Sequence, residues 1–545
     1  MTGTGLLLIA ALRRDLLTVL LWLAAIAGLW AAVLGGLSAA FDEEARRGLV
    51  ALLSAQPALL LLRGAPAGTG LGAVMFVSTF AYLAVMVAFM MTFFAVRHAR
   101  GDEEAGRAEL VRGTAVGRWA PLTATLLAGA VELLVVCGAT LAVSLGLGLD
   151  ATGSLLMAAA LVGVGAIAML TGLIASRALP TSRAANGAAS IVVAAWFFAR
   201  GVGDALGTPS ADLARVEAAW PVWLSPIGWG AQAHPFADAP WQPDGTPLLL
   251  FVAVGSVLLG LVIAIEDRHE LGRSLLPEPV GRARGSAMLG ASAAGAPLGL
   301  TARLLRGQLL AWVLTGAALG VLVGRLAPVV AGAIADIPQL RVIVEQLGDH
   351  RDGDSASAFI MALAAIAGAV ASAAAMQGAL RLRHEERAHG ELVLATTVRR
   401  LGWLGSHVLL GGLTGVGVLA AFALVAGIVL SASGDDRWGE LGAAVLTMLP
   451  LVAIYLAVGA ALVALLPSTV AWLGWVLLVG LLLSGEFAPL LGDAWVWLER
   501  ISPFHWIADP LAASPDWSGS WWLLGAASAL LAVAAVGFHR RDAVA

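Results

Sequence analysis

Long apolar runs separated by short polar segments repeat along the entire chain. About 20 helical residues are enough to cross the hydrocarbon core of a bilayer. The pattern therefore predicts an all-α polytopic membrane protein with about 12 membrane-spanning helices. We expect these spans near residues 16–39, 71–96, 120–148, 154–176, 186–206, 246–265, 309–330, 356–380, 405–431, 441–465, 469–490 and 519–538.

A charged segment, 97–119, interrupts this pattern and returns once, at 381–403. A shift of 282 positions without a gap aligns eight identical residues within a window of sixteen. The aligned residues are Glu103, Glu104, Glu109, Leu110, Val111, Thr114, Val116 and Arg118, with Glu385, Glu386, Glu391, Leu392, Val393, Thr396, Val398 and Arg400. Internal repetition of this kind is typical of transporters built from two homologous halves.

A second marker repeats in the same order within each half. Two unrelated markers predict tandem six-span halves at 1–265 and 299–545, and residues 266–298, rich in Gly, Pro, Ala and Arg, are expected to be a cytoplasmic linker. Each half is expected to begin with a short interfacial helix, at 4–14 and 301–306. The residues of the second marker are Ser225, Pro226 and Trp229 of SPIGW, and Ser502, Pro503 and Trp506 of SPFHW.

The composition agrees with a membrane protein, because 59% of residues are hydrophobic and only 12% are charged, with a mean hydropathy of +0.88. All 32 basic residues are arginine. A phosphate-binding loop of the form GxxxxGK[ST] requires a lysine, so the chain is not a P-loop ATPase. The single cysteine, Cys137, lies in an apolar run, which excludes an internal disulfide framework and a cysteine-based metal site.

The arginines indicate the orientation. Of the 32, 22 fall on the side of the predicted N-terminus and 10 on the other side. Cytoplasmic loops of membrane proteins carry an excess of Lys and Arg. We therefore expect a multi-pass protein of the cytoplasmic membrane, with both termini and both charged segments cytoplasmic and the SPxxW loops outside.

The charged segments are the first candidate site, which we interpret as docking helices for a cytoplasmic partner. The alternative is a solvated loop that only carries positive-inside charge, but that rule predicts arginines and not a repeated EE…ELV pattern. His384, Glu385 and His389 resemble the zinc motif HExxH, yet their spacing turns the two rings about 140° apart on a helix, so no metal site is expected. The docking residues are Glu103, Glu104, Arg107, Glu109, Arg112, Glu385, Glu386, Arg387 and Glu391.

Glu132 is the clearest ionisable residue inside a predicted span. A charge at mid-bilayer costs on the order of 3 kcal/mol on insertion scales, so we expect this side chain to face the bundle interior. It is either a proton or cation site or a hydrogen-bonding contact between helices. Thr414 at the matching position of the second half favours the contact.

The outer loops are a second candidate site. Ten of the nineteen Trp lie in two outer stretches, which indicates an interfacial aromatic belt or, alternatively, an apolar vestibule and outer gate built on the SPxxW loops. Arg200, Asp204, Glu486 and Asp493 lie near outer span ends, where we expect them to reach water, with a role in the gate as the alternative.

Two classes of function fit these features. A permease subunit of a pump driven by a separate ATPase explains the missing nucleotide site and the two docking segments, one for each of two ATPase subunits. A proton-coupled secondary transporter acting alone through Glu132 is the alternative, although the spans hold few acids, histidines or arginines. A membrane enzyme fits less well, because no convergent His, Asp, Ser or metal cluster is present, and nothing points to nucleic acid.

The interfacial helix, the EEAGRAELVR segment after the second span, the SPIGW loop and their duplication resemble the fused twelve-span permeases of type-2 ABC exporters, of the polyketide-antibiotic and tetronasin-resistance kind. The resemblance covers essentially the whole chain. It implies a non-enzymatic permease that has membrane lipid as a partner and exports hydrophobic or amphipathic drugs, while a separately encoded ATPase dimer binds ATP and Mg. Export of a lipid or an envelope component is the alternative.

The family's coupling-helix role falls on 103–112 and 385–394. Gly106 and Arg107 of the first half are replaced by Ala388 and His389 in the second, which leaves open whether both segments dock equally well.

Overall fold

A computed structural model describes residues 2–40, 42–239, 241–268, 272–276, 295–336, 355–396, 398–487, 496–508 and 515–541. The chain forms two compact units, Met1–Gly281 (unit 1) and Arg282–Ala545 (unit 2). Most of the predicted linker at 266–298 lies outside the described residues, so the linker stays a prediction.

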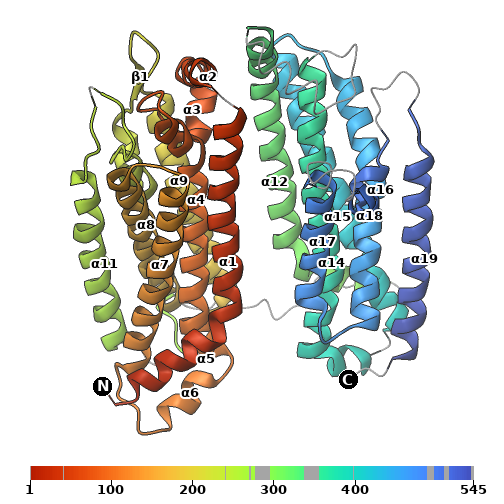
Figure 1. The fold of residues 1–545 in the computed structure, drawn as a ribbon. Helices are drawn as coiled ribbons and strands as arrows, with labels where there is room; N and C mark the ends of the chain where they lie inside the picture. Colours follow the sequence, from red (N-terminus) through yellow and green to blue (C-terminus); the bar gives the residue numbers. More distant parts are fainter. Residues whose placement is uncertain are drawn as a thin grey trace. The chain divides into compact units, whose positions relative to one another are not determined.

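Unit 1 is a bundle of long helices (Figure 1). Two of them, α4 and α8, pack against each other and are buried on almost all sides, which agrees with their uniformly apolar sequences. The helices are long and apolar enough to cross a membrane, as predicted. They are α1 (Thr4–Ala40), α4 (Leu71–Val96), α7 (Ala120–Gly146), α8 (Ala151–Ala178), α9 (Ser182–Ala205) and α11 (Leu249–Arg268).

The predicted separation of a short interfacial helix from the first span is not observed as a break. Helix α1 runs from Thr4 to Ala40 through Arg13 and Arg14, and its first turns lie at an angle to the longer upright part of the helix (Figure 1). No proline or glycine follows these arginines to end the helix, and Asp15 is buried inside the unit, where it pairs with Arg97. The paired charge allows the helix to pass through this polar position.

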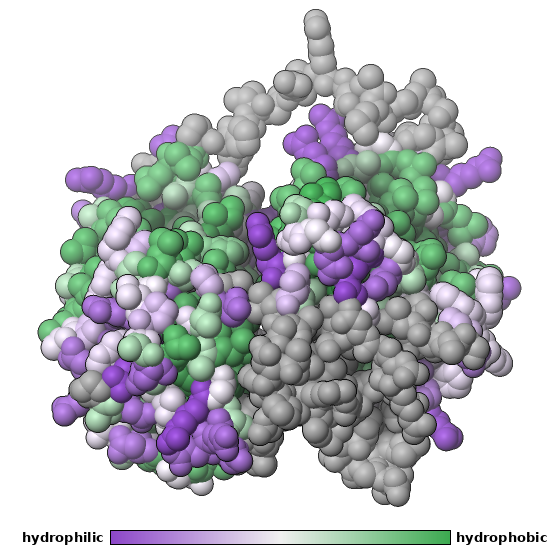
Figure 2. All heavy atoms as spheres, turned by 90° about the horizontal axis from the view of Figure 1, so that it is seen from above, coloured by the Kyte–Doolittle hydropathy of each residue, from purple (hydrophilic) through white to green (hydrophobic). Residues whose placement is uncertain are grey.

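The two ends of unit 1 carry its shorter elements. The end with the N-terminus holds the first charged segment, as η1 (a π-helical turn, Arg97–Gly101), α5 (Asp102–Glu104) and α6 (Arg107–Arg112). The opposite end, which Figure 2 views from above, presents hydrophilic and hydrophobic residues side by side. Its elements are α2 (Glu43–Ala55), α3 (Pro57–Arg63), the antiparallel strands β1 (Thr208–Pro209) and β2 (Val216–Glu217), η2 (Trp220–Leu224), α10 (Pro226–Ala231) and η3 (Thr246–Leu248).

Unit 2 repeats the order of long helices. In the described parts of the chain, eleven helices are long and apolar enough to span a membrane, and the apolar stretch of α17, Leu473–Leu482, is shorter. Unlike the broken segment of unit 1, the second charged segment continues α14 as one helix. The elements are α12 (Gly295–Asp336), α14 (Ser355–Leu394), α15 (Arg400–Ala432), α16 (Trp438–Leu465), α17 (Val470–Phe487), α18 (Val496–Ile501), η7 (Pro503–Trp506) and α19 (Ser518–Arg540).

Candidate functional site

The first charged segment is held to unit 1 by its two adjacent glutamates. Glu103 accepts a hydrogen bond from Arg100 at 3.0 Å and also pairs with Arg177 at the end of α8. Glu104 accepts hydrogen bonds from the backbone N–H and the hydroxyl of Ser182 at 2.7 and 2.5 Å. These carboxylates therefore join α5 to α8 and α9. The docking role expected for them stays a prediction.

The second charged segment is attached in a similar way. Glu386 accepts a hydrogen bond from Arg383 at 2.9 Å and pairs with Arg541, which follows α19. Glu385 lies 3.1 Å from the Nε2 atom of His407 on α15. Both glutamates are buried. Their charges are thus directed toward the other helices of unit 2.

The hydrogen bonds of the two charged segments match with an offset of one residue from the gapless sequence alignment. Glu103 pairs with the arginine three positions before it, Arg100, and Glu386 does the same with Arg383. The structural counterpart of Glu103 is therefore Glu386, and unit 1 has one additional residue before the shared ELV sequence. That residue lies in the turn where Gly106 adopts a positive φ of 71°, which glycine accepts at little cost.

The exposed face of both segments centres on a leucine. Leu110 is 74% exposed and Leu392 is 70% exposed, and the gapless alignment matches them to each other. Large apolar side chains in a repeated, charged setting at a bundle end are typical of a contact surface. The exposed charged members of the predicted site are Glu104, Arg107, Glu109 and Arg112 in unit 1, and Arg387 and Glu391 in unit 2.

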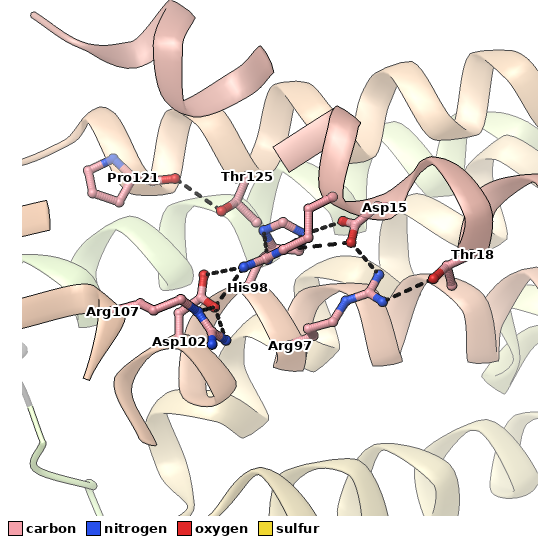
Figure 3. Close-up of polar contacts among 9 residues, drawn as sticks. Asp15, Thr18, Arg97, His98, Asp102, Arg107, Pro121 and Thr125 are labelled. Atoms are coloured by element: carbon pink, nitrogen blue, oxygen red, sulfur yellow. Dashed lines mark hydrogen bonds and ion pairs between the residues drawn. The ribbon is translucent and has the colours of Figure 1, made fainter. Parts of the chain in front are cut away.

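A buried polar network connects the first charged segment to α1 (Figure 3). Asp15 is 1% exposed, lies 3.1 Å from Arg97 and forms a hydrogen bond with His98. Arg14 extends the network, since it contacts His98 and donates to Asp102 at 2.9 Å. The sequence pattern did not predict this cluster. The available signal was an aspartate inside the apolar run LRRDLL.

A pocket of about 230 Å³ lies beside this network. Leu7 of α1, Val111 of α6 and Pro121 of α7 contribute apolar walls, and several arginines and carboxylates line it together. The opposite charges compensate one another, so the lining does not select one class of ligand.

Glu132 lies in the interior of unit 1, as expected, with 3% of the residue exposed. Its Oε1 atom has no hydrogen-bond partner among the described residues. Asp15 and Arg97 are the charged groups that act on it electrostatically. Thr414, its match in unit 2, is satisfied within its own helix, because its hydroxyl donates to the carbonyl of Leu410 at 2.6 Å. At this matched position, α7 of unit 1 therefore carries a carboxyl group and α15 of unit 2 carries a hydroxyl group.

The SPIGW sequence forms a compact turn at the other end of unit 1. The Ser225 hydroxyl accepts a hydrogen bond from the Gly228 N–H and caps α10, and Pro226 occupies the first helical position. The indole N–H of Trp229 donates to the carbonyl of Trp223 at 2.6 Å. This is a structural role for all three residues of the marker, and the gate role stays a prediction.

The SPFHW sequence repeats the arrangement in unit 2. Ser502 precedes Pro503, the first residue of η7, and its hydroxyl donates to the carbonyl of Leu481 at 2.7 Å. The indole N–H of Trp506 donates to the carbonyl of Arg500 at 2.9 Å, six positions earlier, as in the first loop. The duplicated marker is therefore a duplicated hydrogen-bonding pattern.

The expectation that Arg200 and Asp204 reach water is wrong. Both are 1% exposed and form an ion pair at 3.0 Å within α9. Arg200 also donates to the carbonyl of Leu61 at 2.9 Å, which satisfies the end of α3. The pair is buried because α3 covers it. The side chains of Glu486 and Asp493 lie outside the described part of the structure.

Glu385 of the HExxH-like sequence contacts His407. Among the described residues, no group of three or more His, Cys, Asp or Glu side chains is arranged to hold a metal ion.

Comparison with known proteins identifies the family. A family model for the C-terminal domain of the multidrug efflux system permease Rv1217c matches residues 295–539. The chain is also 32% identical, over 559 aligned residues, to the multidrug efflux system permease protein Rv1217c of Mycobacterium tuberculosis (strain ATCC 25618 / H37Rv). That match covers 99% of this chain and 95% of the mycobacterial protein, so it includes both units. The predicted resemblance to exporter permeases is confirmed, and the chain belongs to the family of multidrug efflux system permeases.

Proposed function

We propose that this chain is the membrane subunit of an ATP-driven ABC exporter and that two copies of a separate ATPase bind its two charged segments. As an efflux permease the chain is not itself an enzyme, and ATP and Mg belong to the partner. The observation that carries the proposal is the duplicated exposed leucine, Leu110 and Leu392, each set among exposed charges. A central apolar anchor within a polar rim is the usual form of an interaction surface.

The attachments of the unit 1 segment explain how docking would move the bundle. Force applied at α6 passes through Asp102 to Arg14 on α1, and through Glu103 to Arg177 on α8. Arg177 continues to Glu266 at the end of α11, with a distance of 2.9 Å. Because these charged contacts are directional and buried or half-buried, they transmit displacement better than a loose loop.

The unit 2 segment has its own attachments. Glu386 pairs with Arg541 after α19, and Glu385 contacts His407 on α15. The segment is also continuous with α14, so a push at Leu392 acts directly along a long helix. The two segments would therefore respond differently to the same ATPase movement.

The relative's name supplies the class of substrate, which we extend to hydrophobic and amphipathic compounds, including antibiotics. The distribution of arginines supports a location in the cytoplasmic membrane with both charged segments and both termini in the cytoplasm. In this orientation the SPxxW ends face outward.

Copurification tests the proposal. The tagged chain is isolated from native membranes, and the ATPase activity of the eluate is compared with that of Leu110→Asp, Leu392→Asp and the double variant. We expect a coeluting P-loop protein, partly lost in each single variant and absent in the double variant, since removal of a central anchor costs about 2 kcal/mol or more. Leu206→Asp is the control, because Leu206 is 65% exposed and lies at the opposite end of unit 1. Retention of full ATPase activity by the double variant contradicts the proposal.

A second candidate is a proton-coupled transporter that acts alone. The observation that favours it is the buried carboxyl group of Glu132, with an unpaired oxygen and Asp15 nearby. Reconstituted vesicles separate the two functions. Transport driven by an imposed proton gradient without ATPase, and abolished by Glu132→Gln, supports this candidate. Transport by the same variant that still depends on ATP and the ATPase rejects it.

A further inference from the structure

A second, larger pocket lies at the SPIGW end of unit 1, with a volume of about 600 Å³. This size is within the range of sites that hold drug-sized molecules, about 300–1,000 Å³. Two indoles, two carboxylates and two carboxamides line it, and no arginine does within the described part of the chain. The lining residues that matter are Trp223, Trp241, Glu217, Asp244, Gln232 and Gln242, with His234.

Three polar side chains of this lining have no partner within the described structure. Asp244 and Thr246 are bonded to each other, because Asp244 accepts hydrogen bonds from the N–H and hydroxyl of Thr246 at 2.8 and 2.6 Å. In the described structure, the side chains of Glu217, Gln232 and Gln242 form no hydrogen bond or ion pair. Other polar residues of the same loops are satisfied, for example Arg215, which donates to the carbonyl of Ala239. Polar side chains that converge on a cavity and have no partner in the fold are available to hydrogen-bond a ligand there.

The backbone at the pocket is strained. His234 adopts a positive φ of 42°, which is unusual for a residue with a side chain. The ring of His234 lies on Trp241, with ring centroids 4.7 Å apart, and the carbonyl of the preceding residue, Ala233, accepts a hydrogen bond from the N–H of Asp244 at 2.9 Å. Strained residues that the surroundings hold in place are concentrated at binding sites.

The geometry points to a site for an organic ammonium cation in this pocket. Glu217 and Asp244 supply negative charge, and Trp223 and Trp241 line the same pocket with aromatic rings of the kind that attract cations. His234 is the only other titratable group facing the pocket among the described residues. Its pKa is lowered to about 4 by burial, with Asp244 partly opposing the shift, so the ring is neutral near pH 7 and does not repel a cation. The inference concerns binding and is independent of whether an ATPase drives the chain.

Calorimetric titration tests the site. The full chain in nanodiscs of zwitterionic lipid is titrated with benzyltrimethylammonium chloride at pH 7. We expect saturable binding at one site, weakened about tenfold by Trp241→Ala and by Glu217→Gln, and less by Trp241→Phe, which keeps an aromatic face. Binding is also expected to weaken below about pH 5, as His234 gains a charge.

Trp220→Ala is the matched control, because Trp220 is in the same loop and 72% exposed but does not line the pocket. Each variant is first checked for an unchanged unfolding temperature. Absence of saturable binding to the parent chain overturns the inference, and so does equal weakening by Trp220→Ala and Trp241→Ala. Saturable binding of maltotriose without binding of the cation also overturns it and assigns the indoles to a carbohydrate.

Discussion

The Nε–H of Arg100 donates a hydrogen bond to the backbone carbonyl of Pro180 at 2.9 Å. The second half repeats this contact between Arg383 and Pro467 at 3.0 Å. In each case an arginine near the end of the second long helix reaches the carbonyl just beyond the fourth, α8 or α16. A cation at the C-terminal end of a helix satisfies free carbonyls and complements the helix dipole. The same hydrogen bond from an arginine to a proline carbonyl thus attaches the charged segment to the neighbouring helix in both units.

Arg100→Leu tests this anchor. The substitution removes the contact with Pro180 and deprives the largely buried side chain of Glu103 of one of its arginine partners. We expect a loss of about 3 kcal/mol in the free energy of unfolding, since removal of one member of a buried ion pair is strongly destabilising. Thermal unfolding of the purified chain in detergent measures it.

Two further variants make the Arg100 result interpretable. Arg100→Lys is expected to recover only part of the stability, because an ammonium group cannot contact Glu103 and Pro180 with the geometry of a guanidinium. Arg107→Leu removes an exposed arginine, 52% exposed at its side chain, and should change stability by less than about 1 kcal/mol. Equal losses of unfolding free energy in Arg100→Leu and Arg107→Leu would show that the contact between Arg100 and Pro180 does not hold the charged segment in place.

Hydropathy alone predicted the helices that cross the membrane, because a span requires a long apolar sequence regardless of its neighbours. The charged segments were also visible, since they interrupt that pattern twice. The contacts that these segments make were not visible in the sequence. Glu103 and Glu386 point into their own units toward Arg177 and Arg541, and sequence spacing does not reveal a partner at that distance along the chain.

Two other features show the same limit. Asp15 was hidden because a single acid in an apolar run gives no indication of the histidine, His98, that it meets. Arg200 and Asp204 were expected at the water boundary because they lie near a span end, but the short helix α3 covers them. Burial by a separate element depends on tertiary packing, which local sequence does not encode.

His234 should make stability depend on pH. Burial lowers its pKa to about 4 in the folded chain, whereas an unfolded histidine has a pKa of about 6.5. The unfolded state therefore binds a proton first as the pH falls. The contribution is fully present above about pH 6.5 and is lost as the pH falls to about 4, by at most about 3 kcal/mol.

His234→Asn isolates this effect, because asparagine tolerates the positive φ of 42° but does not titrate in this range. Unfolding temperatures of both chains are compared at pH 7 and pH 4.5. The parent chain is expected to lose more stability than the variant. Parallel losses would assign the pH dependence to other groups.

Trp229→Phe tests the SPxxW turn. The variant keeps an aromatic ring but loses the indole N–H that donates to the carbonyl of Trp223. Trp229 is buried, so the freed carbonyl and the smaller ring should cost about 1–3 kcal/mol. Trp506→Phe removes the equivalent bond where the side chain is exposed, and water replaces the donor. A smaller loss, below about 1 kcal/mol, is expected there, and a reversed order would refute the burial argument.

Gly411 tests whether small residues allow close helix packing in unit 2. A Cβ atom at Gly411 on α15 would lie 2.7 Å from the carbonyl oxygen of Ala375 on α14, and one at Gly378 would lie 2.6 Å from the Cα atom of Gly411. The obstacles are backbone atoms, which do not rotate away, so the helices must separate. Gly411→Ala is therefore expected to lower the free energy of unfolding by about 1–3 kcal/mol. Gly405→Ala on the same helix, where nothing lies within 4 Å, should be neutral or stabilising by up to about 1 kcal/mol. Unfolding temperatures of the two variants measure the difference, and equal values would mean that α14 and α15 are not held at backbone contact.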